Sequence, residues 1–490
     1  MVLMQVGAFY EVYALQNNNN NTYYGSNILE FIRICDLNIA NKNVSINEDK
    51  VCMAGFSHYM LDKYIRRLQN EGYTIVVYNQ DMQEKNTTRS LAGIYSPGTS
   101  FLSDSETKIT NNTICIWLYV MDFPHSNSRN KDNIKTIYIG ASNIDIYTGK
   151  TCMYEFNEPY IKNPTTFDNL ERFVSVYNPS EVILIGNMEL NEIETIIQYT
   201  NIRCNAIHRI SLELHENENE NENENIKRAL NCQKQNYQLM ILQKYYNSSD
   251  FDLFYEYAIA AQSFCFLLDF IYTHNPNLLN KIYYPEIENC STRLSLANHS
   301  LKQLNIIDDY TYKGKLSSVE KFLNNCVTSM GKRLFSYNLL NPTTNVEELN
   351  IEYDMIDYLI NNSSILEYIK SNIQNIKDLD KLSRLIMIKK ITPCNFYQIY
   401  ENIIQIKKIN KYLLNDEALQ KYITHKNSIS NIGGYCSHLI TAIDDKLKLD
   451  ICKNIDNYSS FEENFFNKGI YDKLDEKNCL YLDSMDILES

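Results

Sequence analysis

The sequence predicts a multidomain protein that combines mixed-sheet α/β domains with an all-helical domain of long helices. Three observations lead to this fold class. At 490 residues the chain is long enough for two to four domains. Strand and helix patterns alternate over roughly the first half, and helical patterns alone follow. With 44% hydrophobic residues, each domain can bury a core of its own.

The first domain is expected over residues 1–112, where short strand patterns alternate with amphipathic helices. Its best-defined helix has apolar residues at i, i+3, i+4 and i+7, and a glycine follows where a helix would stop. These patterns together predict one α/β domain of ordinary size. The expected strands cover residues 1–14, 73–78 and 90–101, and the expected helices cover 27–35 and the face of Leu61, Tyr64, Ile65 and Leu68 before Gly72.

A second α/β domain is expected over residues 113–250. The order strand, strand, helix, strand predicts a mixed sheet. The alternating Glu and Asn residues at 216–225 repel one another and cannot form a core, so we expect a linker or a loop insertion there. The strands are expected at 114–123, 135–149 and 181–186, and the helix at 167–178.

The chain from residue 251 to 455 is expected to be all helical. Its apolar residues recur at helical spacing, and no strand pattern interrupts them. Long helices are expected at 253–272, 317–340 and 345–360, the last of which begins after an Asn-Pro-Thr-Thr start signal.

Charge and cysteine content narrow the functional classes. The net charge of −14 argues against a protein that coats nucleic acid, because phosphate contacts need clustered Lys and Arg, so any DNA contact must come from a limited patch. The 13 cysteines include no C-x-x-C and the 8 histidines no H-x-x-x-H, so no metal site is expected. No apolar stretch is long enough to cross a bilayer, and we expect a soluble intracellular protein without membrane contact, its compartment unspecified.

Four separated blocks resemble the MutS family of DNA mismatch-repair proteins, in that family's order and approximate spacing. The first, Gly7-Ala8-Phe9-Tyr10-Glu11, is similar to the family's G-D-F-Y-E signature, with Ala8 in place of the usual Asp. The segments IGASNIDIYTG and YNPSEVILIG look like the family's connector domain, and NFFNKGIYDKLDE looks like the start of its clamp. The other blocks are Ala54-Gly55-Phe56 with Leu61-Asp62-Lys63-Tyr64, Gly72-Tyr73 and Gln80; Arg89 with Ser96-Pro97-Gly98-Thr99; and Thr328 with Met330-Gly331-Lys332-Arg333-Leu334, Leu339-Leu340 and Pro342.

The resemblance implies a mismatch-binding domain at 1–112, a ribonuclease-H-like connector at 113–250, a helical core and lever domain at 251–455 and the start of a clamp at 456–490. It implies mismatched double-stranded DNA as the ligand, with a MutS-type dimer partner and a MutL-type protein as further partners. Full-length family members are DNA-dependent ATPases that use ATP and Mg²⁺. This chain has no G-x-x-x-x-G-K-[ST] loop and looks incomplete at both ends beside the family, so we expect no catalytic residue, enzyme activity or cofactor in it.

Phe9 and Glu11 are the candidate DNA-reading residues. The resemblance implies that Phe9 wedges beside a mispaired base from the minor groove and that Glu11 contacts the same base. A wedge must unstack a base step at a cost of about a few kcal/mol, and a mismatch has already lost part of that stacking. The alternative is that Phe9 is a buried strand residue and Glu11 its solvated neighbour. The ordered set of blocks favours the first interpretation.

Four basic residues are secondary candidates for phosphate contact. Lys63, Arg66 and Arg67 lie on or beside one predicted helix, and Arg89 stands before the Pro-Gly turn. The ordinary interpretation of all four is solvation at the surface.

Two rival functions fit parts of the sequence. One is that of a MutS relative that clamps branched DNA or binds partner proteins without reading mismatches, but the resemblance implies that such relatives lack the Phe and Glu pair. The other is a nuclease that uses Asp145 in the connector. Metal-dependent cleavage needs several convergent carboxylates, and we find only one in that strand.

Overall fold

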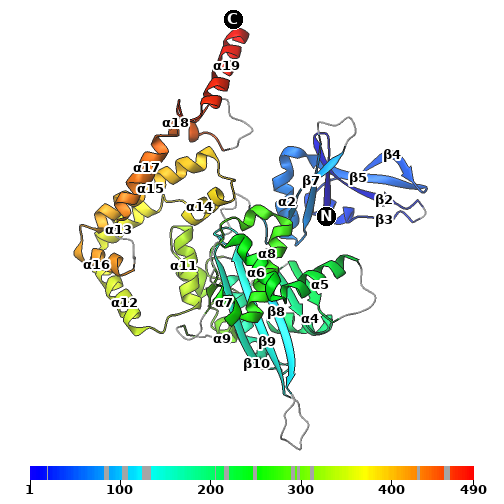
Figure 1. Cartoon of the computed structure of the whole chain (residues 1–490), viewed down its shortest axis with the longest axis horizontal. Coiled ribbons are helices and arrows are strands. Elements are labelled where there is room, and N and C mark those ends of the chain that lie inside the picture. Colours follow the sequence, from blue (N-terminus) through cyan, green and yellow to red (C-terminus); the bar gives the residue numbers. More distant parts are fainter. Residues whose placement is uncertain are drawn as a thin grey trace, which may run out of the picture. The chain divides into compact units, whose positions relative to one another are not determined.

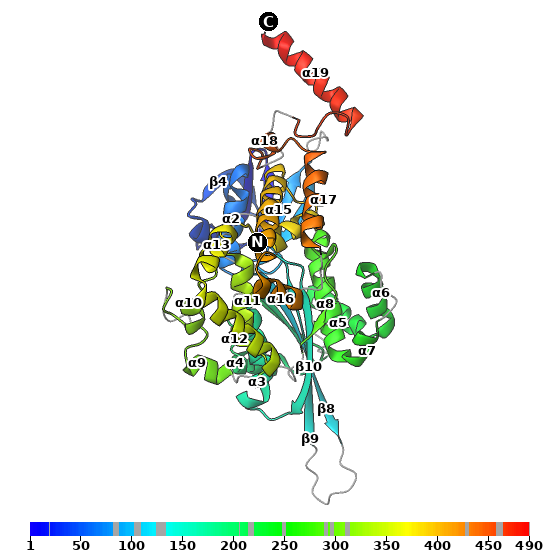
Figure 2. The same ribbon diagram turned by 90° about the vertical axis from the view of Figure 1, so that its left-hand side faces the viewer.

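The chain forms two compact units, Met1–Asn289 with Leu296–Gln303, and Cys290–Ser295 with Leu304–Ser490. The first unit holds two mixed sheets and the second is helical, which confirms the predicted fold class (Figures 1 and 2). The structure is a computed structural model, and it describes residues 1–18, 20–81, 88–101, 109–123, 134–204, 206–213, 220–246, 251–288, 293–294, 298–308, 314–426, 431–456 and 464–489.

The first sheet has the strand order β4-β5-β2-β1-β6-β7, with β3 paired to β2. β1 runs parallel to β6 and antiparallel to β2, so the sheet is mixed. The apolar run at the N-terminus folds as two strands because Gly7, at φ +58°, allows the chain to turn back. The elements are β1 (Val2–Val6), β2 (Phe9–Gln16), β3 (Tyr23–Tyr24), α1 (Ile28–Cys35), β4 (Ala40–Ile46), β5 (Asp49–Ser57), α2 (Leu61–Asn70), β6 (Ile75–Gln80) and β7 (Arg89–Tyr95).

Helices α1 and α2 cover one face of this sheet. Tyr10 and Val12 of β2 share a buried cluster with Phe31 of α1 and with Ile65 and Leu68 of α2. Side chains on a strand alternate between faces, so the neighbouring positions of β2 point to the opposite face of the sheet. The predicted amphipathic helix is therefore confirmed, and it fixes which side chains of β2 lie away from the core.

The second sheet has the order β12-β11-β8-β9-β10-β13. β9 is antiparallel to both β8 and β10, whereas β11 is parallel to β8, which confirms the predicted mixed sheet. The strand β10 was not predicted from the sequence. The elements are β8 (Asn112–Phe123), β9 (Ile134–Asp145), β10 (Thr151–Pro159), α3 (Asp168–Tyr177), β11 (Glu181–Gly186), α4 (Leu190–Tyr199), β12 (Ala206–Ser211), α5 (Glu220–Cys232), α6 (Gln235–Tyr245), α7 (Asp252–Glu256), α8 (Ala258–His274), β13 (Glu286–Ile287) and α9 (Asn298–Gln303).

Helix α8, which we expected to open the helical domain, packs on the second sheet instead. A Cβ on Gly140 of β9 would stand 2.4 Å from the backbone nitrogen of Ala260, so the glycine permits this close approach. Glu155 on β10 accepts hydrogen bonds from the backbone N–H groups of Ile259 and Ala260, both at 2.8 Å, and so caps the first turn of the helix. The expected domain boundary at residue 251 is therefore misplaced, since α8 belongs to the first compact unit.

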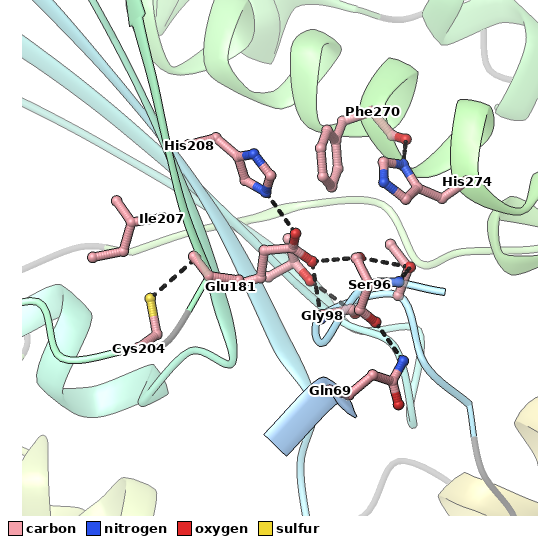
Figure 3. Close-up of polar contacts among 12 residues, drawn as sticks. Gln69, Ser96, Gly98, Glu181, Cys204, Ile207, His208, Phe270 and His274 are labelled. Carbon is pink, nitrogen blue, oxygen red and sulfur yellow. Dashed lines mark hydrogen bonds and ion pairs between the residues drawn. The ribbon is translucent and has the colours of Figure 1, made fainter. Parts of the chain in front are cut away.

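A turn that follows β7 is held from two sides. The carboxylate of Glu181, which is fully buried at the start of β11, accepts hydrogen bonds from the Ser96 hydroxyl at 2.5 Å and the Gly98 N–H at 2.9 Å. His208 Nε2 lies 2.7 Å from the other carboxylate oxygen (Figure 3). On the other side, the Gln69 amide at the end of α2 donates to the Ser96 carbonyl at 2.9 Å. This network joins the first domain to the second sheet.

Part of the Glu and Asn run is helical, and the expectation of a linker or loop is wrong there. Residues 220–225 form the beginning of α5, whereas 216–219 lie outside the described residues. Ala229 and Cys232, further along α5, are buried.

The second compact unit consists mainly of helices in the part that the structure describes. The helix expected at 317–340 is interrupted, because the Thr328 side chain accepts a hydrogen bond from the Gly331 N–H and begins a new helix. The helix expected at 345–360 is present as Val346–Asn361, with Asn345 as its cap. No helix among the described residues is both long and apolar enough to span a membrane. The helices are α10 (Val319–Leu323), α11 (Ser329–Leu340), α12 (Val346–Asn361), α13 (Ser363–Ile373), α14 (Leu379–Met387), α15 (Pro393–Leu413), α16 (Glu417–Lys426), α17 (Ile432–Asp444), α18 (Leu449–Cys452) and α19 (Asp472–Glu489).

Candidate functional site

The turn between β1 and β2 is braced by two neighbouring strands. The Gly7 N–H donates to Oε1 of Gln80, the last residue of β6, at 2.9 Å. The His58 N–H, just after β5, donates to the Ala8 carbonyl at 2.9 Å. These bonds fix the start of β2, so its first residue, Phe9, is presented from a defined backbone.

Phe9 and Glu11 lie on the sheet face that points away from α1 and α2. Phe9 is 48% exposed, whereas Glu11 is only 6% exposed. The alternative interpretation expected a buried Phe9 and a solvated Glu11, and the structure has the opposite arrangement. An exposed aromatic ring therefore stands two residues from a buried carboxylate on the same face.

The Glu11 carboxylate is held by two polar neighbours. Lys42 Nζ, from β4, lies 2.9 Å from Glu11 Oε2, and the Tyr13 hydroxyl donates to the same oxygen. Burial and the hydrogen bond to Glu11 raise the pKa of the Tyr13 hydroxyl. Hydrogen bonds with Tyr13 and Glu11 raise the pKa of the Lys42 ammonium, which therefore stays charged at neutral pH.

The absence of a side chain on Gly55 makes room for Glu11. Gly55 lies opposite Glu11 in the β2–β5 ladder, and a Cβ there would stand 2.9 Å from Glu11 Cγ and 2.7 Å from the Tyr10 carbonyl oxygen. The Tyr10 carbonyl oxygen belongs to the backbone, so it cannot move aside as the end of a flexible side chain can. The glycine is thus part of the site, because a side chain at this position would clash with Glu11.

The three basic residues of α2 are not brought together with Phe9. Ile65 and Leu68 of that helix face the core, so α2 lies on the opposite side of the sheet. Lys63 and Arg67 are exposed and sit over the Tyr64 ring, with 5.7 Å from Lys63 Nζ and from Arg67 Cζ to the ring centroid. Arg66 of the same helix is half-buried.

Arg89 is the predicted basic residue that lies closest to the β1–β2 turn. Its Nε donates to the Gln5 carbonyl at 3.0 Å, and Arg89 pairs with Gln80 in the β6–β7 ladder. Gln80 also receives the Gly7 N–H, so one strand end links Arg89 to the turn that presents Phe9. Of the four predicted basic residues, Arg89 is therefore the one linked to this turn.

Sequence reasoning missed Lys42 and Tyr13. The alternation of β2 could have placed Tyr13 on the face of Phe9 and Glu11, because these residues are two apart. Lys42 is 31 residues from Glu11 in the chain, and the pairing of β4 with β5 brings it there. No local pattern in the sequence predicts the pairing of β4 with β5.

Asp145, the residue that the nuclease alternative would use, accepts hydrogen bonds from residues around its own turn. It accepts hydrogen bonds from the Asn111 N–H at 3.0 Å, the Tyr147 N–H at 3.1 Å and the Thr148 hydroxyl at 2.8 Å. In the part of the chain that the structure describes, no group of three or more His, Cys, Asp or Glu is placed to hold a metal ion. The geometry therefore assigns Asp145 to the turn.

Comparison with known proteins gives matches to two family models and to several curated proteins. The model of MutS domain I matches residues 1–104, and the model of MutS domain III matches residues 299–476. A protein of Acanthamoeba polyphaga mimivirus, named as a mutS homolog, is 26% identical over 97% of this chain and 43% of its own length. The mitochondrial DNA mismatch repair protein mutS homolog of Sarcophyton glaucum is 24% identical over 77% of the chain and 39% of its length. The DNA mismatch repair protein MutS of Borrelia turicatae is 22% identical over 95% of the chain and 50% of its length. The chain thus spans about half or less of the length of these relatives.

Proposed function

The chain belongs to the MutS family, and from this premise we propose that it recognises mispaired or looped-out bases in duplex DNA in the course of mismatch repair. The relatives named above carry mismatch repair in their names. We propose further, from family membership alone, that a MutS-type dimer partner and a MutL-type protein act with it.

The observation that carries the proposal is the exposed Phe9 ring at a braced turn. An apolar wedge kinks DNA by entering between base steps, and the unstacking it requires costs least where a base is already mispaired. Kinking is also cheaper at a weakly stacked step. A ring that is 48% exposed on a fixed backbone suits this task, because little conformational freedom is lost on insertion.

Glu11 supplies the second part of the proposed recognition. Its carboxylate offers an acceptor to a displaced base, and regular duplex presents no such base to it. The hydrogen bond is therefore available to the mismatched ligand alone, which separates the right ligand from the wrong one. The protein then distinguishes mismatched from regular duplex by how easily the DNA deforms, and it does not need to read the base sequence.

The test is a direct comparison of two DNAs with the full 490-residue chain. We expect a duplex with a single G·T mismatch to bind about ten- to a hundredfold more tightly than the matched duplex, a difference of about 1.4–2.8 kcal/mol. Fluorescence anisotropy with labelled duplexes of identical flanking sequence measures both constants. Equal affinities for the two DNAs would overturn the proposed function.

A second expectation concerns salt. The chain carries a net charge of −14, and Arg89 is the predicted basic residue closest to the turn of Phe9, so we expect contacts to only a few phosphates. The affinity for homoduplex DNA should therefore be weak and fall with a shallow slope as salt rises. Anisotropy titrations at several salt concentrations give the slope. A slope that implies about ten or more neutralised phosphates would contradict a small interface.

A further inference from the structure

Glu11 is a buried carboxylate on the face that we propose meets DNA. Its side chain is 8% exposed and that of Lys42 is 32% exposed. Removing the partner of a buried ion leaves an uncompensated charge, which is strongly unfavourable. The position of Glu11 therefore depends on Lys42.

The geometry around Lys42 restrains the carboxylate on one side. Lys42 Nζ lies 2.9 Å from Glu11 Oε2, 2.8 Å from the Tyr13 hydroxyl and 4.7 Å from the centre of the Tyr13 ring. Among the described residues, both hydrogen bonds to the Glu11 side chain end on Oε2. Oε1 is then the oxygen that can accept a hydrogen bond from a ligand.

The net charge of the Glu11 and Lys42 pair determines whether the phosphates of DNA repel it. A lone carboxylate would be repelled by the phosphates of any duplex, mismatched or not. Paired with the Lys42 ammonium, it adds no net charge to the surface. The pair can then approach the duplex while Oε1 keeps its capacity to accept a hydrogen bond from a displaced base.

We propose that Lys42 is a positioning residue for mismatch selectivity: it neutralises Glu11 and holds its carboxylate with Oε1 turned toward the base. The inference rests on the proposed function and adds a residue to it. Lys42 acts through Glu11 and not through a DNA contact of its own.

A double-mutant cycle on the full chain tests this, with the ratio of mismatch to homoduplex affinity as the readout. A charge effect that is the same on both DNAs cancels in this ratio. We expect Lys42→Met to lower the ratio by about five- to tenfold in the parent, because the carboxylate loses its partner and its orientation. In a Glu11→Ala background, Lys42→Met should leave the ratio unaltered and lower the affinity for both DNAs by the same factor.

Companion variants separate positioning from folding. Lys42→Arg should restore most of the ratio, and Tyr13→Phe should lower it about two- to threefold, because that change removes only a hydroxyl. Lys50→Met, at an exposed lysine of the neighbouring strand β5, removes the same charge and should leave the ratio unchanged. Thermal melts of each variant check that the first domain is folded.

The outcomes are distinct. An equal fall of the ratio in both Glu11 backgrounds would mean that Lys42 contacts DNA itself, and no fall in either would mean that it plays no part in selectivity; each overturns the inference while the proposed function stands. A parent chain with a ratio near one would instead overturn the proposed function, and the inference with it.

Discussion

Phe9→Ala should lower the affinity for a mismatched duplex by about ten- to a hundredfold and leave homoduplex affinity nearly unchanged. Truncating an aromatic ring that stacks on a base costs about 1–3 kcal/mol, and regular duplex is not expected to accept the ring. Paired anisotropy titrations of the variant and the parent, on mismatch and homoduplex, measure the effect. Because Phe9 is half exposed, its removal should cost the fold little.

The control for this experiment is Leu29→Ala. Leu29 is 50% exposed and lies on α1, which covers the other face of the sheet, so its truncation removes a similar exposed apolar surface away from the proposed site. It should change neither affinity. Equal losses on both DNAs for Phe9→Ala would mean that the ring supports the fold and does not act as a wedge.

Glu181→Ala should lower the free energy of unfolding by about 3 kcal/mol or more. The carboxylate is fully buried and accepts from the Ser96 hydroxyl and the Gly98 N–H, both of which would lose their acceptor (Figure 3). Trp117, the single tryptophan of the chain, is buried in β8 of the same sheet. Its fluorescence during urea unfolding therefore reports on the region that the change affects.

Two further variants make this result specific. Glu194→Ala removes a glutamate from an exposed ion pair with Arg209 and should cost less than about 1 kcal/mol. Gly98→Ala should also destabilise, by about 1–3 kcal/mol, since a Cβ there would stand 2.3 Å from Thr113 Oγ1. If Glu181→Ala unfolded at the same urea concentration as the control, the network would contribute nothing measurable to stability.

Local patterns predicted much of the secondary structure, because one face of a helix or strand is read directly from its apolar spacing. α2 is an example. β11 was predicted instead from a continuous apolar run, and β10 was missed because TCMYEFNEP has neither such a run nor a strict alternation of apolar and polar residues. α8 was predicted as a helix but assigned to the wrong domain. Periodicity says which face is apolar and does not say what covers it.

The candidate site was predictable in part for the same reason. Phe9 and Glu11 stand two apart on one strand, so their common face follows from the sequence. The exposure of Phe9 and the burial of Glu11 depend on β4 and β5, which contribute Lys42 and Gly55. Such pairings join residues far apart in the chain, and a single sequence carries no direct record of them. The network of Ser96 and Glu181, 85 residues apart, was missed on the same ground.

Because α8 packs on the second sheet, its position determines where the chain can be truncated without exposing a buried surface. A shortened version that stops at residue 250 would lack Phe264, Leu267, Leu268 and Ile271, which are buried in the intact chain, and would bare the apolar surface of β8 and β9 that they help to cover. Exposed surface of this kind drives aggregation. A version that stops at residue 289 keeps the helix, its glutamate cap and the short strand β13 that closes the sheet edge beside β10. Dissection of the molecule into separately expressed parts should therefore begin from the second of these cuts.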